Sequence, residues 1–172
     1  MGECFDKVAR VLGLGYPGGP KIDKLSKTGS PIIKFLESDA LKNTYNISYS
    51  GLKTAVINYL HKKEQLEEEI NIENVCASFQ EEAFTPLINK VVRAAKENKQ
   101  NKIVVAGGVS ANSYLRENLQ IECDKNDINL FFPTLKLCTD NAAMVGAQAY
   151  YNLINNIGLS DLNSSAQPSL KL

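Results

Sequence analysis

Two adjacent glycines and an asparagine follow a short apolar run in the stretch KIVVAGGVSAN at 102–112. Because glycine has no Cβ, Gly107 and Gly108 allow the backbone to come within contact distance of a flat base or a ribose. Asn112 supplies an amide that donates and accepts hydrogen bonds near the first turn of the next helix. The pattern indicates a nucleotide-binding turn. The alternative is that the two glycines only allow close packing, which strand–Gly–Gly–helix turns do about as often as they bind a nucleotide.

Four segments of the chain carry a resemblance to one known family. In order, they are GECFDKVARVLGLGYPGGPKIDKL at 2–25, SYSGLKTAV at 48–56, VVAGGVSANSYLRENL at 104–119 and CTDNAAMVGAQAY at 138–150. Together they resemble the TsaD/Gcp/YgjD family, the tRNA threonylcarbamoyladenosine transferases of the actin-like ATPase superfamily. The resemblance covers nearly the whole chain and fades only at 61–74 and beyond residue 157.

The resemblance assigns ligand contacts to residues that spacing alone would not bring together. It implies that Asp6 faces the nucleotide, where a carboxylate accepts hydrogen bonds from both ribose hydroxyls, and that Gly19, Asp23 and Asn112 also contact the ligand. Taken without the resemblance, Asp6 is an ordinary surface charge. The same comparison makes Asp140 a metal ligand, although an aspartate at a helix start is equally well explained as an N-cap.

The metal site implied by the resemblance needs residues that this chain does not contain. The family carries a His-x-x-x-His pair and a Gly-Gly-His turn in its amino-terminal half, whereas the only histidine here is His61, in the charged run HKKE of a solvated helix face. A divalent metal, Fe²⁺ or Zn²⁺, would therefore lack two histidine ligands, and a single carboxylate cannot hold it tightly. We expect residues 1–157 to be a carboxy-terminal lobe that is incomplete at its amino-terminal side.

The activity implied by the resemblance is acyl transfer without a protein nucleophile. The threonylcarbamoyl group would pass from threonylcarbamoyl-AMP to the adenosine next to the tRNA anticodon, with TsaB- and TsaE-like proteins as partners. This chain alone is expected to be inactive. One alternative is a non-catalytic scaffold that binds a nucleotide or a partner. Another is a fragment of an actin-like ATPase or sugar kinase, which shares the fold. Lys53 in SGLKT could reach a phosphate, but no glycine-rich loop of a triphosphate site accompanies it, so we interpret this motif as structural.

The composition is that of an ordinary cytoplasmic globular protein. Of 172 residues, 44% are hydrophobic and 22% charged, and the 19 basic residues balance the 19 acidic ones, so no overall basic field points to nucleic acid. The four cysteines form no Cys-x-x-Cys pair, which argues against a zinc knuckle and a disulfide framework. No apolar run approaches a membrane span, which takes about 18 residues, and we expect no signal peptide.

The first two thirds of the chain should be mainly helical. The patterns predict a helix over 3–12, a short helix opened by Pro20, a short strand at 43–49 and a helix capped by Ser50. A long helix should follow Asn71, and Pro86 should bend or break it because its ring removes one backbone hydrogen bond.

The last third should be an α/β unit. Two strands covered on both faces are expected at 103–106 and 130–132, each followed by a helix, at 111–120 and 140–156. A helical crossover makes such strands parallel. The expected fold is therefore a helix-rich, partial actin-like ATPase (RNase H-like) domain with a short parallel sheet, followed by a flexible tail at 158–172. Apolar faces left open would favour self-association of the chain.

Overall fold

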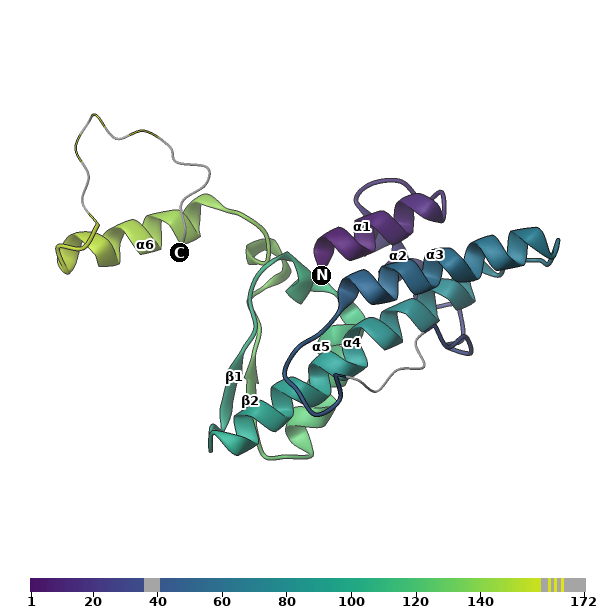
Figure 1. Ribbon diagram of the computed structural model, residues 1–172. Helices are drawn as coiled ribbons and strands as arrows, with labels where there is room; N and C mark the ends of the chain where they lie inside the picture. The colour runs from purple at the N-terminus through teal and green to yellow at the C-terminus, as the bar shows by residue number, and fades with distance from the viewer. Residues whose placement is uncertain (36–40, 159–160, 162, 164, 166–172) are drawn as a thin grey trace. The chain divides into compact units, whose positions relative to one another are not determined.

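A computed structural model describes residues 1–35, 41–158, 161, 163 and 165. The chain divides into two compact units, Met1–Cys138 and Thr139–Leu172. The elements, labelled in Figure 1 where there is room, are α1 Gly2–Val11, α2 Gly18–Ser26, α3 Tyr49–Gln65, α4 Ile72–Glu97, β1 Lys102–Val104, η1 Gly108–Ala111, α5 Ser113–Asp124, β2 Asn129–Phe131, η2 Leu135–Leu137 and α6 Ala142–Ile154. Most of the expected tail at 158–172 lies outside the described residues.

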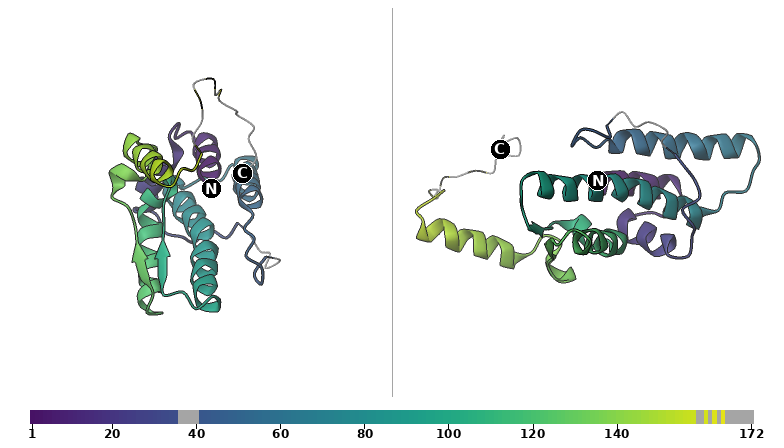
Figure 2. Two further views of the ribbon diagram at one scale, coloured as in Figure 1. Left: turned by 90° about the vertical axis from the view of Figure 1, so that its left-hand side faces the viewer. Right: turned by 90° about the horizontal axis from the view of Figure 1, so that it is seen from below.

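Helix α4 is the centre of the first unit. It packs against α2, α3 and α5, and Figure 2 shows it between α3 and α5. The helix begins where the side chain of Asn71 accepts a hydrogen bond from the backbone N–H of Asn74 (2.7 Å). Its buried stripe includes Phe79, whose ring meets that of Phe5 on α1 at a centroid distance of 4.8 Å. The apolar periodicity therefore predicted this helix correctly.

Pro86 does not break α4, contrary to one of the two outcomes expected from the sequence. The helix continues from Ile72 to Glu97. Proline removes the bond to the carbonyl four residues earlier, but Phe84 and Ile88 on either side are buried in the core. Tertiary packing thus holds the helix together across the missing bond.

The sheet consists of two parallel strands, as the crossover pattern predicted. Ile103 of β1 pairs with Leu130 of β2, and α5 connects the strands. The expectation that both faces are covered is wrong among the described residues, because Val104 is 76% exposed and Phe131 51% exposed. Within β1 and β2, Ile103 and Leu130 pack against the core, so the sheet is covered on one face only.

Two further expectations are corrected near the starts of helices. Residues 43–49 form no strand but a turn followed by the start of α3. The cap of α3 is Ser48 and not Ser50, since the Ser48 hydroxyl accepts a hydrogen bond from Gly51 N–H at 3.2 Å. In the second unit, α6 is capped by Asn141 through the N–H of Met144 (3.0 Å).

The described part of the second unit is a helix with apolar side chains open to solvent. The exposed side chains on α6 include Met144, Val145, Tyr150, Tyr151 and Leu153. Such a surface is what the expectation of self-association rests on. Within the described ranges, no helix combines the length and the apolar character that a membrane crossing requires.

The hydroxyl of Tyr49 is expected to make the fold sensitive to alkali. Burial raises the pKa of Tyr49 from its ordinary 10.0 to about 12, and its hydroxyl has no hydrogen-bond partner among the described residues. The unfolded chain therefore loses this proton first, so stability is complete below pH 10 and falls as the pH rises towards 12.

We expect Tyr49→Phe to flatten this alkaline loss. The variant should match or exceed the wild type at neutral pH, because it removes an unpaired buried hydroxyl. Urea midpoints at about pH 8 and about pH 11 measure the effect. Tyr16→Phe is the control, since Tyr16 is 80% exposed. An unchanged alkaline slope in Tyr49→Phe would contradict the assignment.

Candidate nucleotide site

The turn at Gly107 and Gly108, the glycine turn, lies at the carboxyl ends of both strands and is open on its outer side. The ladder extends beyond β1, because Val105 N–H donates to Phe131 O at 3.0 Å. Gly107 then takes φ +87° and ψ 168°, a region that only glycine adopts readily. A Cβ built on Gly107 or Gly108 meets no heavy atom within 4 Å. Close packing, the alternative explanation for the pair, is therefore not what these two glycines serve in the described structure.

Asn112 has a structural role at the start of α5. Its Oδ1 accepts a hydrogen bond from Leu115 N–H at 2.9 Å and so caps α5, which begins at Ser113 and not at the expected residue 111. Its Nδ2 donates to Oε1 of Gln80 on α4 at 2.7 Å. Gln80 is only 2% exposed and donates in turn to Ser26 Oγ at 2.7 Å. One N–H of the Asn112 amide remains for a ligand.

Asp23 meets the same helix start. Its Oδ1 accepts a hydrogen bond from Ser113 Oγ at 2.8 Å, and its Oδ2 accepts one from Ser113 N–H at 3.2 Å. The structure thus brings Asp23 and Asn112 together, although they are far apart in the sequence. A polar network that joins α2, α4 and α5 holds them there; it consists of Asp23, Ser26, Gln80, Asn112 and Ser113.

Asp6 lies at the contact between α1 and α2, and Gly19 belongs to the first turn of α2. Asp6 Oδ1 accepts a hydrogen bond from Gly18 N–H at 2.8 Å, so its carboxylate holds the start of α2 against α1. A Cβ on Gly18 would lie 2.7 Å from Asp6 Cα, which explains the glycine there. Gly19 has open space beside it and shares a face of α2 with Asp23, four residues on. Asp6 is therefore more than a free surface charge.

Sequence reasoning missed Arg116, which joins the two strand ends. Its Nε donates to Ser110 O at 2.6 Å and its Nη2 to Pro133 O at 2.8 Å and Cys138 Sγ at 3.3 Å. The guanidinium also lies over the Phe132 ring, 4.6 Å from the centroid. The only sequence signal was an arginine in the first turn of α5, a position that favours acidic residues. In open α/β sheets, ligands bind at such strand ends.

The remaining predicted site residues do not form a metal site in the described part of the chain. Asp140 is exposed and belongs to the second unit, just before the cap Asn141. His61 is exposed on α3, as expected, and Lys53 lies half-buried on the same helix. Among the described residues, no three His, Cys, Asp or Glu side chains cluster closely enough to hold a metal ion.

Comparison with known proteins identifies the family of this chain. The family profile described as TsaD, tRNA N6-adenosine threonylcarbamoyltransferase, matches residues 1–147. Curated relatives of that name include proteins from Clostridium perfringens (strain 13), 50% identical, and from Clostridium botulinum strains Kyoto and 657, 51% and 52% identical. Each match covers 99% of this chain and 50% of the relative, so the chain spans about half the length of these proteins. The chain therefore belongs to the TsaD family of tRNA N6-adenosine threonylcarbamoyltransferases.

Proposed function

We propose that this chain is part of a tRNA threonylcarbamoyladenosine synthase and supplies its nucleotide-binding wall. The substrate would be threonylcarbamoyl-AMP and the acceptor the adenosine next to the tRNA anticodon. Family membership supports the reaction. The observation that carries the role of this chain is the open glycine turn beside the Asp23–Asn112 network.

The proposed binding mode uses the hydrogen-bonding capacity that the fold leaves over. The adenine would lie against Gly107 and Gly108, where no side chain intervenes. The free N–H of Asn112 would donate to the adenylate. Asp6 Oδ2, which makes no hydrogen bond to a described residue, and Asp23 would accept hydrogen bonds from the ribose hydroxyls. The chain would then hold and orient the adenylate while the acceptor amine attacks.

The divalent metal of the family, Fe²⁺ or Zn²⁺, would take Asp140 as a ligand and would polarise the acyl group. The described residues provide no further ligands beside it, so they do not fit a complete metal site. We also propose that residues 1–157 form part of an actin-like (RNase H-like) domain in a cytoplasmic protein, with TsaB- and TsaE-like partners. The parallel pair with its helical crossover is consistent with that fold.

Titration with AMP and GMP, followed by chemical-shift perturbation, tests the proposed nucleotide site. We expect weak binding of AMP, with shifts at residues 106–112, and weaker binding of GMP. Gly108→Val places two methyls in the open space beside the turn and should reduce AMP affinity by about tenfold or more. The fold should tolerate the change, since Gly108 needs no positive φ. Gly146→Val, at another open glycine, is the control.

Two outcomes would contradict the proposed site. One is that AMP moves no resonance near residues 106–112. The other is that AMP and GMP behave alike in the wild type and in Gly108→Val. Either result would favour a non-catalytic scaffold that binds a partner protein instead.

A further inference from the structure

A cavity of about 640 Å³ lies in the first unit, between the segment 41–52 and one face of α4. Its lining shares no residue with the glycine turn or with the Asp23–Asn112 network. The α4 side contributes Pro86, Lys90 and Arg93, which recur at the spacing of one helical face. A volume of this size is typical of sites for small organic molecules.

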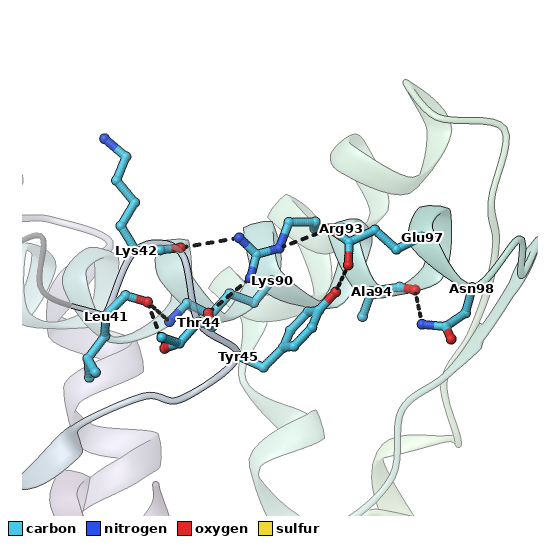
Figure 3. Close-up of polar contacts among 9 residues, drawn as sticks. All are labelled: Leu41, Lys42, Thr44, Tyr45, Lys90, Arg93, Ala94, Glu97 and Asn98. Carbon is cyan, nitrogen blue, oxygen red and sulfur yellow. Dashed lines mark hydrogen bonds and ion pairs between the residues drawn. The ribbon is translucent and has the colours of Figure 1, made fainter.

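Lys90 is a buried cation at the edge of this cavity. The residue is only 9% exposed, and its Nζ donates to Leu41 O at 2.8 Å, as Figure 3 shows. The same Nζ also donates to Asn46 O. No carboxylate in the described residues forms an ion pair with it. Backbone carbonyls orient the ammonium but carry no negative charge, and a buried charge without a counter-ion is unfavourable. One of the three N–H donors of the Lys90 ammonium therefore remains to donate to a ligand.

Arg93 places a second cation one turn further along α4. Its Nη1 donates to Lys42 O at 3.2 Å and its Nη2 to Thr44 O at 3.0 Å, and Figure 3 shows the guanidinium held between these carbonyls and the ring of Tyr45. Glu97 approaches Arg93 Nε only to 3.7 Å and also accepts a hydrogen bond from the Tyr45 hydroxyl. Further guanidinium N–H groups of Arg93 therefore remain for an anion.

The rest of the lining suits an apolar body attached to an anionic group. Leu41, Ile47, Leu52 and Pro86 contribute apolar surface. Among the described lining residues Glu82 is the one acidic residue, and its Oε1 already accepts a hydrogen bond from Phe35 N–H at 2.8 Å. Two cations beside an apolar wall distinguish this cavity from a simple packing gap.

We propose that this cavity binds a small organic oxyanion, a carboxylate or a phosphate ester with an apolar body, through Lys90 and Arg93. The binding is independent of the proposed nucleotide site, from which the cavity is separate. The oxyanion would take the free N–H groups of the two cations, and the apolar body would cover Ile47 and Pro86.

Benzoate, phenyl phosphate and the neutral benzamide, titrated into the whole chain, test the proposal. We expect saturable shifts at residues 41–52 with benzoate, phenyl phosphate or both, and at least about tenfold weaker binding of benzamide. Binding of only one anion would assign the site to carboxylates or to phosphate esters. Equal binding of benzamide, or an absence of shifts at 41–52 with both anions, overturns the proposal.

Two sets of variants locate the binding. Asn89 is exposed and lines the cavity, and its side chain makes no hydrogen bond to a described residue. Asn89→Trp should therefore fill the space and abolish the shifts, while Asn89→Ala retains them. Arg93→Gln should weaken binding about tenfold, with thermal melting recorded alongside. Undiminished binding in Asn89→Trp overturns the assignment to this cavity. Shifts by AMP at 41–52 instead of 106–112 would support this site and contradict the nucleotide site.

Discussion

Gly29→Ala should leave the chain largely unfolded, whereas Gly19→Ala should leave it folded. A Cβ on Gly29 would lie 2.0 Å from Glu73 O, 2.3 Å from Glu73 C and 2.8 Å from Asn74 N. These are backbone atoms in the first turn of α4, which cannot move aside as the end of a flexible side chain would. The cost should exceed the usual 1–3 kcal/mol of overpacking and reach about 4 kcal/mol, a large part of a typical total stability of about 5–15 kcal/mol.

The local hydrogen bonds explain why the clash cannot be relieved cheaply. Ser30 N–H donates to Asn74 Oδ1 at 2.8 Å, and Asn74 N–H donates to the cap Asn71, so any shift breaks the start of the central helix. Gly19 lies in the first turn of α2 with open space beside it, so alanine there meets no neighbour and should change the stability by no more than about 1 kcal/mol. Urea unfolding followed by circular dichroism measures both variants. Equal midpoints for the two would contradict this account of α4.

The helices of this chain were predictable because the residues that stabilise each helix lie within it or directly beside it in the sequence. The apolar stripe of α4 and the caps Asn71 and Asn112 stand within a few residues of the turns that they stabilise. The parallel pairing also followed from local order, since a strand, a helix and a second strand permit few arrangements.

The strand expected at 43–49 failed for a non-local reason. Tyr45, Ile47 and Tyr49 alternate as in a strand, but the backbone carbonyls of this segment bond to cations on α4 instead of to a neighbouring strand. Lys90 takes the carbonyl of Asn46, and Arg93 takes that of Thr44, as Figure 3 shows for Arg93. The spacing of residues 43–49 does not predict hydrogen-bond partners that lie more than forty positions away.

The candidate site was predictable only in part. The glycine turn and the place of Asn112 near a helix start followed from residue types. The hydrogen bond between Asp23 and Ser113 spans 90 positions, and no periodicity connects them. Gln80 gave a weak signal, as a polar residue within the apolar stripe of α4. The family resemblance supplied Asp23 because it carries positions that are distant in sequence, and the structure then placed Asp23 beside Asn112.

With synthetic threonylcarbamoyl-AMP and a tRNA transcript, this chain alone should produce no threonylcarbamoyladenosine above the uncatalysed background. The described residues hold the adenylate side of the proposed site but contain no cluster that could bind the metal. A lone carboxylate such as Asp140 binds a transition metal weakly, so the acyl group would be neither polarised nor held. Nucleoside analysis of the tRNA by mass spectrometry measures the product.

Supplying the remainder of the Clostridium perfringens relative as a separate polypeptide should restore product formation, because this chain is 50% identical to the half that it matches. Under these conditions Gly108→Val should reduce turnover by at least about tenfold, whereas Asn89→Trp should not, since the cavity beside α4 is separate from the proposed adenylate site. Turnover by this chain without the second polypeptide would show that the ligands for catalysis are already present in it. Restoration that is insensitive to Gly108→Val would mean that the other polypeptide binds the adenylate without this turn, and the glycines would then serve only the path of the backbone into α5.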